Sequence, residues 1–150
     1  MATVQVPPNC DLTLGMVCEE KSEPGRTRWR MQADERFLNP AGVVQGGFIG
    51  AFCDSAMGAA TVTWARGRKV LTANVEMKVS FLGAVRAGTT LVCTATVVGG
   101  GSRVVFAEAR VMDGERLVAT ASSTYVLTPR ATGADAPDQS AGASVARPLA

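Results

Sequence analysis

The chain has 150 residues, of which 47% are hydrophobic and 19% charged, and its net charge is +2 at pH 7. This length suits one domain with a sizeable core, spanning residues 1–128. We expect no nucleic-acid partner, because the sequence holds no basic run and no aromatic residues interleaved with basic ones. We also expect no membrane span, because no apolar run reaches the roughly 18 residues that a spanning helix needs. Residues 1–9 lack the features of a secretory signal, so the expected location is the cytoplasm.

Histidine is absent from the chain. This excludes Ser-His-Asp and Cys-His catalysis as well as histidine-ligated zinc. The four cysteines show no Cys-x-x-Cys spacing, so neither a metal site nor a redox motif is expected. Cys53 and Cys93 are interpreted as reduced core residues. Any catalysis must therefore come from carboxylates, backbone amides, hydroxyls and carboxamides, and no metal or bound cofactor is expected.

The first third of the chain predicts a strand hairpin followed by a loop. Residues 1–13 are expected to be a loose lead-in. Segments 15–21 and 26–33 flank a Ser-Glu-Pro-Gly sequence, whose Pro-Gly pair is a turn signal, so they are predicted to form two antiparallel strands. Residues 34–47 contain Pro40 and are predicted to stay non-helical.

A buried helix is predicted over about residues 48–65. Small and apolar residues dominate it, and 3.6-residue spacing places on one face Phe48, Phe52, Ala56, Ala59 and Thr63. Its glycines give it a poor intrinsic helix propensity, so tertiary packing must stabilise it. A helix this slim and nearly uncharged suits a position in which a curved sheet wraps closely around it.

The rest of the chain predicts four antiparallel strands. Residues 71–81 alternate between a polar and an apolar face, which is typical of a half-buried strand. The polar face is Thr72, Asn74, Glu76, Lys78 and Ser80, and the apolar face is Ala73, Val75, Met77, Val79 and Phe81. Glycine-containing turns, of which Asp113-Gly114 is the strongest signal, precede strands at 89–98, 103–112 and 116–127. Residues 129–150 are rich in Ala, Gly, Ser, Asp and Pro and are expected to be a disordered tail.

These elements predict an α+β architecture in which one long central helix is wrapped by an antiparallel sheet of about six strands. A sheet of this size covers only part of the helix, and its edge strands need protection. Pairing two subunits through an edge solves both problems. We therefore expect a homodimer, and a homotetramer built as a dimer of dimers.

Asp54 lies inside the predicted helix and is the only charged residue between Arg36 and Arg66. An ionised carboxylate there is costly unless something specific uses or satisfies it. Gly46 and Gly47 lie at the helix N-terminus, where free N–H groups and the helix dipole favour negative charge and glycine lets a substrate approach the backbone. Plainer interpretations stay open. The glycine pair can serve only a tight turn, and the aspartate can bond to a neighbouring backbone group or arginine.

The loop, the helix and the four-strand meander together resemble the hotdog-fold acyl-CoA thioesterases over about residues 15–127. The nearest resemblance is to the phenylacetyl-CoA-type, PaaI-like branch, related to the 4-hydroxybenzoyl-CoA thioesterases. That branch carries Asn-x-x-Gly-x-x-His-Gly-Gly followed by Asp on the helix. The matching residues here are Asn39, Gly42, Gln45, Gly46, Gly47 and Asp54. Gln45 stands where the family usually has histidine; its amide can donate a hydrogen bond but cannot transfer a proton.

The resemblance implies a role for each residue of this motif. Asp54 would be the general base or nucleophile and would face the loop of the partner subunit. The Gly46 amide would be the main oxyanion donor, helped by Asn39 or Gln45. Thr72 matches a Ser or Thr that often helps position the water in the family, although an exposed strand threonine explains it nearly as well.

Substrate contacts are expected from Gly47, from the polar face of residues 71–81 through Asn74, and from Arg103. Arg103 follows a Gly-Gly-Gly-Ser turn and could contact the phosphates of coenzyme A. The sequence therefore predicts an acyl-CoA thioesterase that hydrolyses a thioester to a free carboxylic acid and coenzyme A. The alternative is a non-catalytic acyl-CoA binding or sensing protein on the same fold, motivated by the missing histidine. A dehydratase or hydratase is disfavoured for the same reason.

Overall fold

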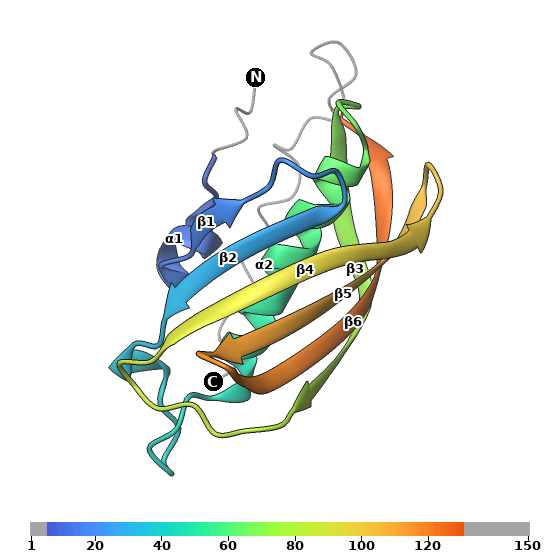
Figure 1. Cartoon of the computed structure of the whole chain (residues 1–150). Helices are drawn as coiled ribbons and strands as arrows, with labels where there is room; N and C mark the ends of the chain where they lie inside the picture. Colours follow the sequence, from blue (N-terminus) through green and yellow to red (C-terminus); the bar gives the residue numbers. More distant parts are fainter. Residues whose placement is uncertain (1–5, 131–150) are drawn as a thin grey trace, which may run out of the picture.

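The structure, a computed structural model, describes residues 6–130. Within them, a six-stranded antiparallel sheet in the order β1-β2-β4-β5-β6-β3 curves around the long helix α2, Gly46–Trp64 (Figure 1). The strands are β1 (Val17–Glu20), β2 (Arg26–Gln32), β3 (Val70–Phe81), β4 (Thr90–Gly100), β5 (Val104–Asp113) and β6 (Arg116–Pro129). The shorter helical segments are α1 (Asn9–Leu14) and the 3-10 helix η1 (Glu35–Phe37). The predicted architecture, one long helix wrapped by six strands, is confirmed.

Helix α1 lies where a loose lead-in was expected. It ends at Gly15, whose φ of 67° is left-handed, and the Gly15 and Met16 N–H groups satisfy carbonyls of the last turn. Leu14 and Met16 are buried in the main core. A helix of six residues is too short to persist alone, so this burial is what stabilises it. Six residues are also too few to show a hydrophobic period.

Helix α2 begins two residues earlier than predicted. Its buried positions are Ile49, Gly50, Phe52, Cys53, Ala56, Met57, Ala60 and Thr61. Phe48, Ala59 and Thr63, which share the predicted face with Phe52 and Ala56, are only half-buried. The buried part of the helix differs from this face because α2 packs against β2, β3, β4, β5 and β6, so the curved sheet covers a broad stripe.

Strand β3 does not keep one polar and one apolar face. The pairing with β6 shifts register between Asn74 and Glu76, so Val75 is the extra residue of a β-bulge. Before the bulge Thr72 and Asn74 face α2, and after it Met77, Val79 and Phe81 do. The predicted faces of residues 71–81 were therefore wrong, because the extra residue reverses the alternation.

The prediction that residues 34–47 stay non-helical was wrong at Glu35–Phe37, where the Asp34 side chain caps the 3-10 helix η1. The interpretation of Cys53 and Cys93 as core residues is confirmed. Cys53 and Cys93 are free thiols and fully buried in the core. Trp29 and Trp64 are half-buried and pack against the core. The predicted tail at 129–150 lies outside the described residues, apart from its first two positions. No helix in the part of the chain that the structure describes is long and apolar enough to cross a membrane.

Candidate active site

The loop before α2 is a compact turn built by Asn39. The side-chain Oδ1 of Asn39 accepts the Ala41 N–H at 2.9 Å, and the Asn39 backbone exchanges hydrogen bonds with Gly42 and Val43. Gly42 has a φ of 74°, which favours glycine. The side-chain oxygen of Asn39 thus serves this turn, so the contribution that the family resemblance implies for Asn39 in substrate polarisation would have to come from its amide nitrogen.

The end of this loop is fixed by three contacts. The Val44 N–H donates to the carbonyl of Val85 at 2.8 Å, and the Gln45 N–H donates to the carbonyl of Phe37 at 2.7 Å. The rings of Phe37 and Phe48 stack with centroids 4.3 Å apart. The first turn of α2 is held in a defined position because both the loop that contains Val85 and the 3-10 helix η1 anchor the residues before it.

The 3-10 helix η1 is itself capped by a carboxylate. Asp34 accepts the backbone N–H of Arg36 at 2.8 Å and forms an exposed ion pair with the Arg36 guanidinium. Both contacts favour the charged carboxylate, and the side-chain hydrogen bond from Arg36 is the larger cause that lowers the pKa of Asp34 to about 2. This cap orders the chain just ahead of the loop that carries Asn39.

Gly46 and Gly47 form the first turn of α2, where backbone N–H groups have no partner within the helix. Among the described residues neither amide donates a backbone hydrogen bond, whereas the next amide, that of Phe48, donates to the carbonyl of Gln45. Gln45 is exposed and its side chain does not cap the helix. Two free amides at the positive end of a helix dipole can stabilise a developing oxyanion.

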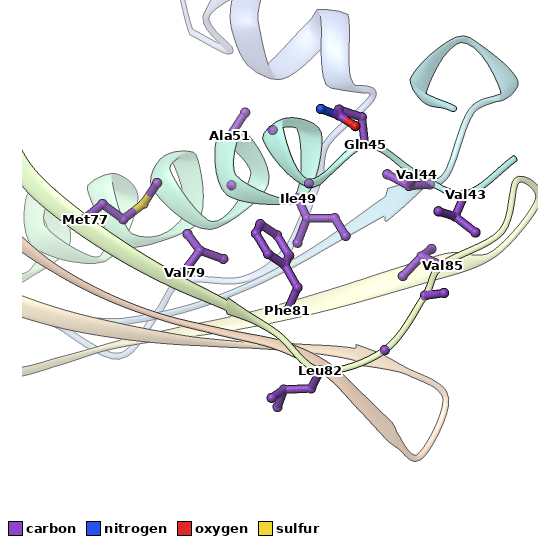
Figure 2. Close-up of a pocket in the computed structure, with 15 residues that line it drawn as sticks. Val43, Val44, Gln45, Ile49, Ala51, Met77, Val79, Phe81, Leu82 and Val85 are labelled. Atoms are coloured by element: carbon purple, nitrogen blue, oxygen red, sulfur yellow. The ribbon is translucent and has the colours of Figure 1, made fainter. Parts of the chain in front are cut away.

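An open groove of about 880 Å³ runs between this first turn and the end of β3. Figure 2 shows Phe81 reaching from the end of β3 toward the start of α2, with Ile49, Val79 and Val85 around it. The side chains that line the groove are apolar except for that of Gln45, and the backbone of Gly46 and Gly47 borders it. The groove therefore combines an apolar wall with a pair of free amides.

Phe81 controls the space next to Gly46. A Cβ atom on Gly46 would lie 2.7 Å from the Phe81 ring tip, whereas one on Gly47 would meet nothing within 4 Å. The close approach of this ring therefore disfavours a side chain at position 46 unless Phe81 moves. Phe81 was assigned only to an apolar strand face by the sequence, and its contact with the helix start depends on the bulge in β3.

The Asp54 carboxylate is half-buried and hydrogen-bonded within its own chain. Its Oδ1 accepts the Tyr125 hydroxyl at 2.6 Å and the Asn74 side-chain amide at 2.8 Å. No ion pair to Asp54 is present among residues 6–130, so the arginine partner that the sequence left open is not found there. Asn74 lies beside Asp54 and not on the outer face with Lys78, where a coenzyme A contact was expected.

Tyr125 and Ser123 are site residues that the sequence did not reveal. Both are buried on β6, and the Ser123 hydroxyl lies 2.8 Å from Oδ1 of Asn74. Burial is the largest cause that raises the pKa of Tyr125 far above its usual value, and the hydrogen bond to Asp54 adds to it. The phenol therefore keeps its proton at neutral pH and can donate it to Asp54. Its only sequence signal is that it is the single tyrosine of the chain.

Asp54 and Gly46 do not meet within one chain. They are eight residues apart on α2, which at 1.5 Å per residue is a separation of about 12 Å along the helix axis. A thioester carbonyl held by the Gly46 amide is therefore out of reach of Asp54 of the same chain.

Thr72 on β3 and Arg103, just before β5, lie toward the C-terminal end of α2. The Thr72 hydroxyl is 3.0 Å from that of Thr61, two helical turns beyond Asp54. Arg103 is exposed next to Ser102, whose carbonyl accepts from Arg68 after the C-terminal end of α2. The structure thus brings neither residue to the Gly46 end within one chain. In the described part of the chain, no group of three or more Cys, Asp or Glu side chains could hold a metal ion.

This combination, a helix wrapped by an antiparallel sheet with free amides at its start and a carboxylate in its interior, defines the class of hotdog-fold thioesterases. Residues 41–120 match the family model of the Thioesterase superfamily. The chain belongs to this superfamily, and it is a thioester hydrolase with the hotdog fold. The predicted resemblance is confirmed.

Individual relatives agree with this assignment. The chain is 33% identical over 97 residues to PA0474 of Pseudomonas aeruginosa, an esterase candidate, covering 65% of this chain and 72% of the relative. A phenylacetic acid degradation-related thioesterase candidate from Ralstonia eutropha JMP134 superposes with a TM-score of 0.73 at 29% identity, covering 79% and 89% of the two chains. The PaaI protein of the E. coli phenylacetic acid degradation operon shares the fold, with a TM-score of 0.73 at 20% identity and coverages of 79% and 83%.

Proposed function

We propose that the protein is an acyl-CoA thioesterase that releases a free carboxylic acid and coenzyme A. The carrying observation is the pairing of two free amides at the start of α2 with a half-buried carboxylate that has no cationic partner among the described residues. The Gly46 amide is the oxyanion donor, with Gly47 beside it and Gln45 orienting the carbonyl. Asp54 is the base or nucleophile. The reaction consumes only the thioester and water, so no further cofactor is required.

The chemistry balances in either role of Asp54. As a base, Asp54 takes a proton from water while the water oxygen bonds to the thioester carbon; the C–S bond then breaks and the leaving thiolate takes up a proton. As a nucleophile, Asp54 bonds to that carbon itself, the thiolate leaves, and water cleaves the resulting anhydride. Negative charge develops on the carbonyl oxygen in both routes, where the Gly46 amide stabilises it. Losing such a donor costs roughly 10²–10³ in rate.

The groove supports an uncharged, apolar acyl group. Its side chains, which include Val43, Ile49, Val79 and Leu82, offer no partner for a charged acyl tail. Burying a carboxylate there without a partner would be costly, so aliphatic or aryl acyl groups fit better than dicarboxylic ones. In a panel of substrates, CoA thioesters of aliphatic or aryl acids should therefore be hydrolysed faster than those of dicarboxylic acids.

We further propose that the enzyme works as a homodimer and assembles into a homotetramer as a dimer of dimers. β3 is an edge strand of 12 residues, and Leu71, Val75 and Met77 on it are exposed apolar residues. A second copy of β3 would pair with this edge and cover them. Such a partner can also bring its Asp54 to the Gly46 end of this chain, which one chain alone cannot do. Its cysteines are free thiols where described, which suits the reducing cytoplasm in which we place the enzyme.

The second candidate function is binding or sensing of acyl-CoA without turnover. The observation that favours it is Gln45, a residue that cannot transfer a proton, at the position next to the free amides. Tight binding of an acyl-CoA that the wild-type protein leaves intact would select this function.

The test is hydrolysis of short, medium, long and aryl-acetyl CoA thioesters, followed by release of free thiol, for the wild type and for Asp54→Asn. The wild type should hydrolyse apolar acyl groups, and Asp54→Asn should lose about 10³-fold or more in kcat because the base or nucleophile is gone. The variant keeps an acceptor oxygen for Tyr125, so its melting temperature should change little. Full activity in a folded Asp54→Asn protein would refute the role of Asp54.

A further inference from the structure

The Asp54 carboxylate is held on one side only. Both of its side-chain hydrogen bonds, from Tyr125 and from Asn74, go to Oδ1. Within residues 6–130 no hydrogen bond or ion pair reaches Oδ2. An ionised carboxylate has room for about four donors, spread over both oxygens. Oδ2 is therefore left for water, a substrate or a partner chain.

The donors on Oδ1 are rigidly placed. Tyr125 is 1% exposed, and its hydroxyl also lies 3.1 Å from the backbone carbonyl of Asp54, so the ring sits directly against this turn of α2. A tyrosine side chain has only two χ angles, and here the core fixes both. Burial and the neighbouring carboxylate raise the pKa of Tyr125 well above its usual value, so the phenol keeps its proton.

Asn74 is oriented from behind by Ser123. The Ser123 hydroxyl lies 2.8 Å from Oδ1 of Asn74 and 2.7 Å from the backbone carbonyl of Glu76, and its single proton can go to either. The opposite amide orientation would set the Asn74 oxygen against the Asp54 carboxylate, two acceptors face to face. The NH₂ end of Asn74 therefore points at Asp54.

The bulge in β3 is what brings Asn74 into this arrangement. Asn74 pairs with Tyr125 across the two strands, and the register shift follows directly after it. In a regular strand Asn74 and Met77, three positions apart, would face opposite sides, and the bulge at Val75 lets both face α2. Bulges often re-aim side chains next to active sites. Here the helix-facing side chains of β3 change from polar to apolar directly after Asn74, which contacts Asp54.

We propose that Tyr125 and Asn74 are positioning residues that clamp Oδ1 of Asp54, so that Oδ2 is the oxygen that reacts with the substrate or its attacking water. This inference rests on the proposed thioesterase function. The clamp fixes the carboxylate plane and stops Asp54 from rotating toward bulk solvent. Oδ2 is then presented in one orientation, toward the space in which the partner chain's oxyanion site would lie.

The test compares two hydroxyl deletions on β6. Tyr125→Phe removes one donor to Asp54 and keeps the ring. Thr124→Val is the matched control, because it also removes a hydroxyl that contacts a β3 carboxylate, that of Glu76 at 3.3 Å on the outer face. We expect Tyr125→Phe to lower kcat by roughly 10- to 100-fold, as misplacement of a reacting group does. KM should stay within about twofold, because the acyl groove is untouched. Thr124→Val should match the wild type.

A crystal structure of Tyr125→Phe supplies a readout that does not depend on activity. The Asp54 carboxylate should be rotated or split between orientations, with the fold unchanged. If Tyr125→Phe does not fold, Ser123→Ala replaces it, since it keeps Tyr125 and loosens only Asn74; its fall in kcat should be smaller. An unchanged kcat together with an unchanged Asp54 orientation would overturn the clamp, as would an equal loss in Thr124→Val. If the wild type cleaves no thioester at all, the proposed function fails. Crystal structures of the wild type and of Tyr125→Phe still decide whether Tyr125 orders Asp54.

Discussion

Two adjacent glycines at the start of α2 have different physical reasons to be glycine. Gly46 is closely approached by Phe81, with its missing Cβ only 2.7 Å from the ring tip, whereas the Cβ position of Gly47 is open. Both have negative φ, so neither requires glycine for backbone conformation. Both glycines have a free N–H, but only Gly46 packs against Phe81. Comparing variants at the two positions therefore isolates the effect of that packing.

We predict that Gly47→Ala leaves the free energy of unfolding unchanged or raises it, because alanine is the better helix former by up to about 1 kcal/mol. Gly46→Ala should be less stable than Gly47→Ala by about 1 kcal/mol, the cost of modest overpacking. The cost stays modest because Phe81 is 54% exposed and can swing outward. Urea denaturation of the two variants measures the difference.

The same comparison in a Phe81→Ala background is the control. Removing the ring should abolish the difference between the Gly46→Ala and Gly47→Ala variants, because the three atoms nearest to the Gly46 Cβ position all belong to the Phe81 ring. Equal stabilities in the presence of Phe81 would mean that the ring does not rest on Gly46 in solution.

At the scale of elements, the bulge in β3 divides one strand between two tasks. Its first half presents Thr72 and Asn74 to α2, where Asp54 needs a donor. Its second half presents Met77, Val79 and Phe81, which line the apolar groove. The bulge therefore puts both the hydrogen bond from Asn74 to Asp54 and the apolar groove on the same side of the sheet.

We predict that deleting Val75 leaves the fold and hydrolysis largely intact. Without the bulge residue, Asn74 and Met77 stand two positions apart, so a regular strand still turns Asn74 and the segment Met77–Phe81 toward the helix. Val75 is 57% exposed, so the free energy of unfolding should change by no more than about 1 kcal/mol. Val75→Ala is the control, because it shortens the side chain and keeps the bulge. Denaturation and thiol release are measured on both. An unfolded or inactive deletion protein would show that the bulge itself is needed to position the site.

The sequence revealed those features that local patterns encode. Asp54 was visible because it is the only charge in a long neutral segment, and the hairpin at Asp113-Gly114 was visible from its turn chemistry. The bulge at Val75 was not visible, because residues 71–81 alternate regularly and only pairing with β6 reveals the extra residue. Tyr125 was missed for a related reason: it lies 71 positions from Asp54, and no local signal links them.

At the scale of the whole molecule, the separation of about 12 Å along α2 between Gly46 and Asp54 is the decisive length. Helix α2 is a regular element held against five strands, so it cannot bend to bring these residues together. In a symmetric dimer, each site would instead combine the Gly46 end of one chain with Asp54 of the other. The free edge of β3 is the surface through which such a dimer would form.

This arrangement predicts complementation between two inactive variants. Asp54→Asn removes the proposed base or nucleophile. Gly46→Pro removes the proposed oxyanion N–H at the first helical position, where proline is tolerated, and its Cβ should displace the exposed Phe81 ring as in Gly46→Ala. Each variant alone should be a folded dimer with little activity. In a mixed dimer, one of the two sites receives the intact Gly46 from one chain and the intact Asp54 from the other.

Co-expression of the two variants should therefore restore about a quarter of the wild-type activity, since about half of the dimers are mixed and each carries one intact site of two. Separately tagged chains allow the mixed dimers to be isolated, and these should reach about half of the wild-type activity per dimer. The control is a mixture of the two purified homodimers assayed before exchange, which should remain inactive. If the mixed dimers are no more active than the parents, the whole reaction takes place within one chain. The separation of Gly46 and Asp54 along α2 would then require a different orientation of the substrate.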